Sequence, residues 1–290
     1  MNARLTVALP VFNGGSLLAE ALECVLREPA DAQPLLRAVV YDNASNDDSV
    51  AIARRFAAKD RRLEVVVREQ NIGAIANFAD AAAAATTPYF AWRAYDDISS
   101  PGYFGQLIEA LEAAPQAVLA APNCVNVKLS SGQRRWRPAP VGLLGPPDTI
   151  ARADSSWLYG VWRTKVAQAA SAWVRARGPA LWGWDHLALL YAALQGPFVG
   201  CESAEFSQRL NTYAEKANGG HSHGARNDAR RAFWEAGREL VLEDSRANGI
   251  SADEIQRRLD ALEVLIERRV LRRPIRGFRD ISVKFRARFA

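Results

Sequence analysis

Residues 5–13 read LTVALPVFN, an apolar run of strand length that ends in a polar residue. Four more apolar runs of strand length follow it along the chain, at 35–42, 63–68, 88–95 and 117–127. Stretches with helical spacing separate these runs, near 16–27, 48–59, 73–85 and 101–113. Strands that alternate with helices need crossover connections, which give a mostly parallel sheet with helices on both faces. We therefore predict an α/β fold in which residues 1–128 form a Rossmann-like half.

The rest of the chain has a different composition. Residues 129–149 are rich in Gly, Pro and Ser, which is typical of a long loop. Farther along, helical spacing predicts helices near 225–247 and 252–272. We expect a second half over residues 129–220 and a helical C-terminal extension over residues 221–290.

Composition narrows the class of protein. The chain has 290 residues, of which 49% are hydrophobic and 24% charged, as in a packed globular protein. Its three cysteines, Cys24, Cys124 and Cys201, are odd in number and lack metal-ligand spacing, so neither a disulfide framework nor a zinc site is indicated. The N-terminus lacks the apolar core of a signal peptide, and no run reaches the roughly 18 apolar residues of a membrane span. We therefore expect a cytoplasmic protein.

The positive charge is concentrated at the C-terminus. The formal net charge is +5, and residues 261–290 carry nine Arg or Lys against three Asp or Glu, a net +6 that leaves the remainder at −1 (5 − 6). A nucleic-acid-binding domain more often spreads its positive surface, and no nucleic-acid-binding motif is legible. We therefore expect no nucleic-acid partner.

Two common nucleotide-binding motifs are absent from the sequence. The first apolar run is followed only by Gly14-Gly15 and not by the Gly-x-Gly-x-x-Gly turn of dinucleotide dehydrogenases. The phosphate loop Gly-x-x-x-x-Gly-Lys-Ser/Thr does not occur either. A nucleotidyltransferase would also need a Gly-rich loop with a basic residue after the first strand, which is missing.

Polar residues follow three of the predicted strands. Asn13 ends the first, Asp42 the second, and Asp96 and Asp97 the fourth. Ligands of open parallel sheets bind at the carboxyl ends of the strands, so these side chains should face one crevice. Asp42 alone could be a turn residue, because Asp favours turns for backbone reasons. The paired carboxylates suit Mg²⁺ or Mn²⁺, which prefer oxygen ligands.

Four segments together resemble the inverting glycosyltransferases of family 2, which have the GT-A fold. They occur in family order and spacing, as LPVFN at 9–13, YDNASNDDS at 41–49, NIGAIANFADAAA at 71–83 and AYDDISSP at 94–101. The resemblance implies a donor site for a nucleotide-diphosphate sugar in this part of the chain. Asp42 would bond the edge of the nucleobase, with Pro10 and Phe12 lining the base pocket and Asn13 and Asn71 nearby.

The same resemblance implies a metal site at the fourth strand. Asp96 would lie beside the ribose and the metal, and Asp97 would coordinate the divalent cation, Mn²⁺ or Mg²⁺, that holds the diphosphate. The family's metal motif usually reads Asp-x-Asp-Asp, whereas here the first acid is replaced by Ala94. Relatives with an Ala-His-Asp-Asp motif are similar, which favours a subfamily trait over an inactive site; weaker metal affinity is an open alternative.

The resemblance extends into residues 129–220, which become the acceptor-side half with mobile loops. Trp162 and Arg163 match a segment on the acceptor side of the donor pocket. They could instead be a core aromatic residue and a surface charge, since buried aromatics usually serve packing. Trp184 precedes Asp185, which matches the start of a helix and would be the general base. Asp185 could instead cap that helix.

Several neighbouring residues are weaker candidates. His186 is expected to support Asp185 or to pack. Arg209, Asn211, His221 and His223 flank or occupy a Gly-rich stretch, NGGHSHG, that either closes over the donor or forms a surface turn.

The basic tail suggests a further partner. Between residues 268 and 290, Arg and Lys alternate with large apolar residues, a pattern that suits a segment lying on an anionic membrane surface. The other interpretation is a solvated helix end docked on the core.

The predicted function is an inverting transfer of a sugar from a nucleotide-diphosphate sugar to a glycan or lipid-linked acceptor in cell-surface polysaccharide biosynthesis. The alternative, motivated by Ala94, is a non-catalytic nucleotide-sugar-binding or scaffold member of a polysaccharide-assembly complex.

Overall fold

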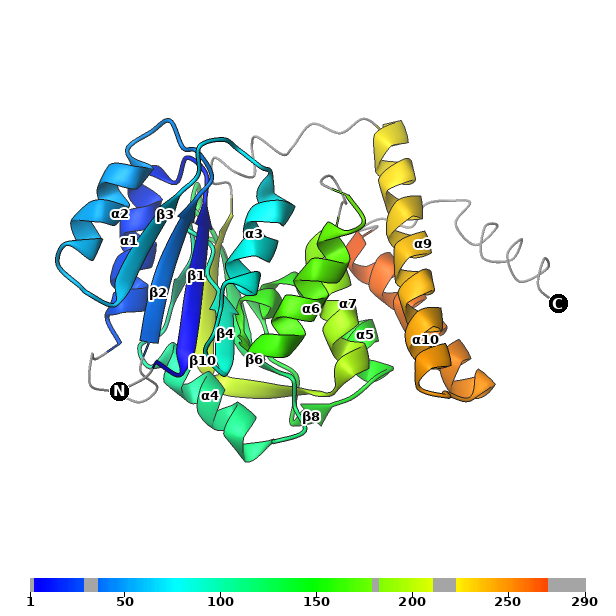
Figure 1. Cartoon of the computed structure of the whole chain (residues 1–290). Coiled ribbons are helices and arrows are strands. Elements are labelled where there is room, and N and C mark those ends of the chain that lie inside the picture. The colour runs from blue at the N-terminus through cyan, green and yellow to red at the C-terminus, as the bar shows by residue number, and fades with distance from the viewer. Residues whose placement is uncertain (1–2, 29–35, 179–182, 211–222, 271–290) are drawn as a thin grey trace.

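A single mixed sheet forms the centre of the molecule (Figure 1). The computed structural model describes residues 3–28, 36–178, 183–210 and 223–270. Within them the strands are β1 (Leu5–Val11), β2 (Leu36–Asp42), β3 (Leu63–Val67), β4 (Tyr89–Trp92), β5 (Ile98–Ser99), β6 (Leu119–Lys128), β7 (Arg134–Arg137), β8 (Leu143–Leu144), β9 (Val161–Arg163) and β10 (Phe198–Leu210). Their order in the sheet is β3-β2-β1-β4-β9-β6-β10-β5, with β7 paired to β6 and β8 to β10.

Most of the paired length of the sheet is parallel. β1 lies parallel to β2 and β4, β2 to β3, and β6 to β10. The antiparallel pairings, which involve β5, β7, β8 and β9, cover two to four residues each. The predicted α/β fold with a mostly parallel sheet is therefore confirmed, and the five strands expected from apolar runs form at those positions.

Helices connect the strands and cover the sheet. They are α1 (Gly15–Leu26), α2 (Ser49–Ala57), α3 (Ala74–Ala83), α4 (Tyr103–Ala113), α5 (Asp148–Arg152), the 3₁₀ helix η1 (Ser155–Tyr159), α6 (Thr164–Arg175), α7 (Trp184–Gln195), α9 (His223–Ala247), α10 (Ala252–Leu265) and the π-helix η2 (Ile266–Val270). Helices α1, α2 and α4 pack through one buried apolar cluster against the sheet. Helices α3, α6 and α7 belong to a second cluster on the other face, and α9 and α10 extend that cluster outward (Figure 1).

The stretch 129–149 is more ordered than its composition suggests. The prediction of one long loop was wrong here, because β7 pairs with β6 and β8 pairs with β10. Gly132 adopts φ +66°, a left-handed conformation that glycine enters without strain, and it turns the chain from β6 into β7. The short β7 is largely exposed, so the alternation of apolar residues that identifies a buried strand is missing from it.

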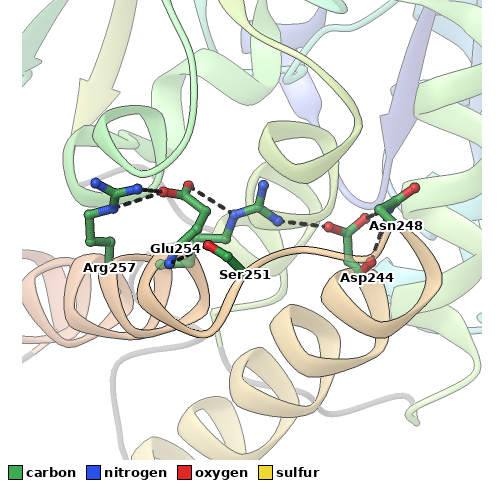
Figure 2. A network of polar contacts seen from close by, with 6 residues as sticks. Asp244, Asn248, Ser251, Glu254 and Arg257 are labelled. Atoms are coloured by element: carbon green, nitrogen blue, oxygen red, sulfur yellow. Dashed lines mark hydrogen bonds and ion pairs between the residues drawn. The ribbon is translucent and has the colours of Figure 1, made fainter.

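The helical extension is held together by a buried ion pair. Arg258 of α10 donates from Nη1 to Oδ2 of Asp244 in α9 at 2.9 Å, and both residues are less than a tenth exposed. Asn248 Nδ2 also donates to the Asp244 carboxylate at 2.9 Å, as Figure 2 shows. Ser251 begins α10 by accepting the backbone N–H of Glu254. These contacts fix the turn between the two helices.

Within the described residues, no helix combines the length and the apolar character that are needed to cross a bilayer.

Candidate functional site

The carboxyl ends of β1 and β2 form the first wall of the site. Val11 pairs with Asp42 in the register of these strands, so Phe12 and Asp42 come side by side as the strands end. Pro10 is buried within β1, whereas Phe12 is 42% exposed. Asn13 turns the chain with φ +54°, donates its backbone N–H to Ser45 Oγ at 2.9 Å and accepts the N–H of Asn46 through Oδ1 at 3.0 Å. The predicted base-pocket residues are thus brought together.

Asp42 is fully buried, and its two oxygens have different surroundings. Oδ2 accepts the backbone N–H of Ser45 at 3.0 Å, which is the turn role that the sequence left open. Oδ1 has no hydrogen-bond partner among the described residues. A buried carboxylate oxygen without a partner costs free energy, so its retention favours a ligand that donates to it.

Asn71 is tied to the same wall through Asn43. Asn43 Nδ2 donates to Asn71 Oδ1 at 2.9 Å, and Asn43 Oδ1 accepts the N–H of Ile72 at 2.9 Å. Asn71 Oδ1 also accepts the N–H of Gly73, the residue before α3. Asn71 is exposed, and its oxygen is occupied in fixing the loop that leads into α3.

The Asp96–Asp97 pair lies after β4, held against β10. Asp97 is 3% exposed and accepts the backbone N–H of Arg209 through Oδ1 at 2.7 Å. The Arg209 guanidinium donates from Nε to the carbonyl of Asp96 and from Nη1 to Glu20 at 2.6 Å. Arg209, which the sequence linked to a loop over the donor, therefore fixes the acidic pair in place.

Burial, followed by the adjacent charge of Asp96, raises the pKa of the Asp97 carboxyl to about 8, although Arg209 and Arg93 act in the opposite direction. A site with this unrelieved repulsion fits a divalent cation, which would favour the ionised form. No group of three or more potential His, Cys, Asp or Glu ligands occurs in the part of the chain that is described. Two adjacent carboxylates are the kind of ligand set that suits a cation of the Mg²⁺ type, which is bound by one or two carboxylates and completes its shell with phosphate oxygens and water.

Arg93 lies beneath this pair and was missed by sequence reasoning. It is fully buried, and its guanidinium lies 4.8, 5.2 and 5.1 Å from the ring centres of Tyr103, Phe104 and Phe206. Nη2 donates to Ser99 Oγ at 3.0 Å. A basic residue that directly continues an apolar strand was the available signal, because charges are rarely buried without a partner or a role.

Asp185 lies in the first turn of α7. The helix starts after Gly183, which has φ +73°, and Trp184 packs edge-on against Phe78 with ring centres 4.9 Å apart. Asp185 Oδ1 accepts the backbone N–H of His186 at 2.9 Å and lies 3.2 Å from its Nδ1. The pKa of the Asp185 carboxyl is lowered: burial raises it, but the contacts with His186 outweigh burial. Its side chain is 30% exposed.

Tyr159 connects Asp185 to the strand ends. Burial raises the pKa of the Tyr159 hydroxyl well above its usual value, and the charges of Asp97, Asp96 and Asp185 each raise it further. The Tyr159 ring stacks on Phe206 of β10 with centres 4.8 Å apart. The charges of all three carboxylates therefore bear on this one side chain.

Trp162 and Arg163 lie elsewhere, which corrects the expectation that they face an acceptor. β9 is antiparallel to β4 and pairs Arg163 with Tyr89 at the start of β4, away from the carboxyl end. Trp162 is fully buried and donates from Nε1 to the carbonyl of Leu158 at 2.9 Å. The Arg163 guanidinium donates to the carbonyls of Ala117, Leu111 and Pro115, so it fixes the end of α4.

Three of the weaker candidates cannot be placed. Asn211 and His221 lie outside the described residues, and His223 is described only as the backbone start of α9.

Comparisons with known proteins agree with the fold. The sequence model of Glycosyl transferase family 2 matches residues 6–166 of the 290. The succinoglycan biosynthesis protein ExoU of Rhizobium meliloti (strain 1021) is 35% identical over 102 residues, which cover 35% of this chain and 29% of that protein. The match thus spans less than a third of the length of that relative.

Solved structures extend the likeness to the whole fold. S. aureus TarS 1–349 in complex with UDP-GlcNAc superposes with a TM-score of 0.73 at 14% identity, covering 95% of this chain and 75% of that one. The mannosyltransferase PcManGT from Pyrobaculum calidifontis, in complex with GDP-Man and Mn²⁺, gives a TM-score of 0.52 at 14% identity, covering 100% of this chain and 81% of that one. At these identities the likeness concerns the fold alone.

Proposed function

The chain belongs to glycosyl transferase family 2, and from that premise we propose that it is an inverting glycosyltransferase acting in polysaccharide biosynthesis. The donor is a nucleotide-diphosphate sugar, and the acceptor is a glycan or a lipid-linked sugar. The UDP-GlcNAc complex of TarS and the likeness to a succinoglycan biosynthesis protein support the donor class and the process.

One observation carries the proposal: Asp42 and the Asp96–Asp97 pair follow the parallel strands β2 and β4, which flank β1, at the carboxyl edge of the sheet. The unpartnered Oδ1 of Asp42 suits a donor group on a nucleobase edge. The acidic pair follows β4, and its repulsion suits a cation between it and a diphosphate. The charges of Asp185 and of that pair each raise the pKa of Tyr159, which supports a site where a sugar would contact both Asp185 and the pair.

In the proposed reaction Asp185 is the general base. Its lowered pKa keeps the carboxylate ionised at neutral pH, in the form that accepts a proton. The acceptor hydroxyl gives its proton to this carboxylate while its oxygen attacks the anomeric carbon, and the bond to the diphosphate breaks on the opposite face. His186 holds the carboxylate through its backbone N–H, which fixes the orientation of the base.

Asp97 and Asp96 would hold the divalent cation, which when bound neutralises charge on the leaving diphosphate. The backbone N–H of Arg209 holds Asp97 against β10, and Glu20 in turn holds the Arg209 side chain. Asp42, Phe12 and Asn13 would orient the nucleoside.

The test is a binding panel followed by turnover. We expect UDP or GDP to raise the melting temperature more with Mn²⁺ than with EDTA, since a ligand of the folded state stabilises it by RT ln(1 + [L]/Kd). Release of nucleotide diphosphate from a donor sugar would then separate an enzyme from a non-catalytic binding protein. Metal-independent binding of every nucleotide would contradict the proposed site.

The remaining expectations are also proposals. The segments 1–128, 129–220 and 221–290 would serve donor binding, acceptor binding and support. Residues 268–290 would contact an anionic membrane surface from the cytoplasm, although residues 271–290 lie outside the described part. Sedimentation with anionic vesicles, compared between the full chain and a chain ending at residue 273, tests that contact.

A further inference from the structure

Tyr159 lies toward the carboxyl edge of the sheet, in the gap between β4 and β6. The short strand β9 occupies only the amino-terminal part of this gap, where Trp162 is paired with Phe90 of β4. Because β9 is antiparallel to both β4 and β6, the residues that precede it continue toward the carboxyl ends of those strands. The same register sets Tyr159 level with Arg93, three residues before Asp96.

The backbone and the ring of Tyr159 are both held in place. Gly160, the next residue, passes so close to β6 that a Cβ there would collide with a backbone carbonyl oxygen. The Tyr159 carbonyl accepts the hydroxyl of Tyr103 at 2.9 Å, and the Tyr159 ring stacks on Phe206 with centres 4.8 Å apart. Phe206 is in turn paired with Ser99, in the strand that follows the acidic pair. A residue held in this way loses little entropy when it binds a ligand.

The 3₁₀ helix that ends in Tyr159 contacts the elements that carry the acidic residues of the site. η1 lies against α7, whose first turn holds Asp185, and against β4, which leads into the Asp96–Asp97 pair. Besides burial, the charges of Asp97, Asp96 and Asp185 raise the pKa of the Tyr159 hydroxyl. The contacts of η1, the register of β9 and the charges thus all relate Tyr159 to the proposed cation site and to the proposed base.

The hydroxyl is the part of Tyr159 that the fold leaves unused. It forms no hydrogen bond with a described residue, and Tyr159 is only partly buried. The hydroxyl of the fully buried Tyr103, by contrast, donates to a backbone carbonyl, as tyrosine hydroxyls usually do inside proteins. A phenol keeps its proton at neutral pH, and negative charges around it favour this neutral form further. The Tyr159 hydroxyl is therefore available as a hydrogen-bond donor.

We propose that the Tyr159 hydroxyl donates a hydrogen bond to the sugar that is transferred, and so helps to select the donor. In the proposed site this sugar lies between the cation, which holds the diphosphate, and Asp185, which receives the proton of the acceptor. Hydroxyl oxygens of a sugar accept hydrogen bonds, whereas ionised carboxylates cannot donate them, so the phenol supplies what the acidic residues lack. A site that bonds a substrate hydroxyl in this way discriminates against sugars that do not present it. This contact rests on the proposed transferase function, since the sugar is that of its donor.

Calorimetry of the full chain with Mn²⁺ tests this contact. The probes are UDP-glucose, UDP-galactose, UDP-GlcNAc and GDP-mannose, and the one that binds the wild type most tightly is compared with its free nucleotide diphosphate. Tyr159→Phe should weaken binding of that nucleotide sugar by about three- to tenfold, the range of one neutral hydrogen bond, and should leave the affinity for the free nucleotide within about twofold. Tyr89→Phe removes a hydroxyl at the start of β4, away from the carboxyl edge, and should change neither affinity.

Phenylalanine keeps the ring that stacks on Phe206 and the carbonyl that Tyr103 bonds, so the melting temperature of Tyr159→Phe should stay near that of the wild type. Failure of the wild type to bind UDP or GDP would count against the transferase site itself. Three results would overturn the sugar contact alone: binding of the free nucleotide but of no nucleotide sugar, an equal loss of affinity for both ligands in Tyr159→Phe, or no loss for either. The second result would assign the hydroxyl to the diphosphate, and the third would make Tyr159 a packing residue.

Discussion

Replacing Asp97 by Asn should remove a pH dependence from the stability of the metal-free protein. Burial and the charge of Asp96 raise the pKa of the folded-state carboxyl to about 8, whereas an unfolded Asp titrates near 3.9. Between these values the folded chain keeps a proton that the unfolded chain has released. The free energy of unfolding of the wild type therefore falls as pH rises from about 4 to about 8, and this contribution is level above that.

The expected size of this pH effect follows from the binding of one proton. Each pH unit in the window changes the free energy of unfolding by about 1.4 kcal/mol, which amounts to about 3 kcal/mol between about pH 5.5 and about pH 8. The side chain is only 3% exposed, so solvent screens this effect little. Asn keeps an oxygen that accepts the Arg209 N–H, so the variant preserves the contact at 2.7 Å while removing the titration.

Urea unfolding followed by circular dichroism, in EDTA at a series of pH values, measures the difference between wild type and Asp97→Asn. Taking the difference cancels the contributions of all other titrating groups. Adding UDP with Mn²⁺ to the wild type should flatten its curve, because a bound cation stabilises the ionised carboxylate. A difference that stays constant from about pH 5.5 to about pH 8 would refute the assigned pKa and with it the repulsion within the acidic pair.

Three further predictions concern other parts of the chain. Asp185→Asn should lower transfer about 10²-fold or more with donor affinity nearly unchanged, since the amide cannot take the acceptor proton; full turnover would assign Asp185 to structure. Asp42→Asn should weaken UDP binding by about tenfold in calorimetry, because the amide N–H₂ can take the place of the unpartnered acceptor Oδ1 while the contact of Oδ2 with Ser45 survives. Unchanged affinity would show that Asp42 does not belong to the nucleoside site. Arg258→Met should destabilise the protein by about 3–5 kcal/mol in urea unfolding, because it leaves Asp244 buried without its ion-pair partner. Arg257→Met removes the arginine of an exposed ion pair and should cost less than about 1 kcal/mol.

The strands and the donor-side residues were predictable because they depend on local signals. The apolar runs that became β1, β2 and β4 are followed by polar residues, and parallel strands bring their carboxyl ends to one edge whatever the rest of the chain does. Asn13, Asp42 and the Asp96–Asp97 pair could therefore be grouped from the sequence alone.

The acceptor side could be predicted less well because strand direction is not a local property. β9 runs antiparallel to β4, and this reversal carries Trp162 and Arg163 to the opposite end of the sheet. The burial of Arg93 likewise depends on three aromatic rings from α4 and β10, which no sequence spacing brings together. β7 was missed for another reason, since an exposed edge strand lacks apolar alternation.

The replacement of the first metal-motif acid by Ala94 has a physical rationale in the geometry of the pair. Ala94 is 9% exposed, and its carbonyl accepts the N–H of Asp97 at 3.5 Å. A carboxylate at this position would be desolvated beside a pair in which the pKa of Asp97 is already raised to about 8, so it would add repulsion that the free protein cannot relieve. With alanine the free site carries less negative charge, but it also offers a cation fewer oxygens. We therefore expect the cation and the nucleotide diphosphate to bind together, because the phosphate oxygens supply the ligands that the chain lacks.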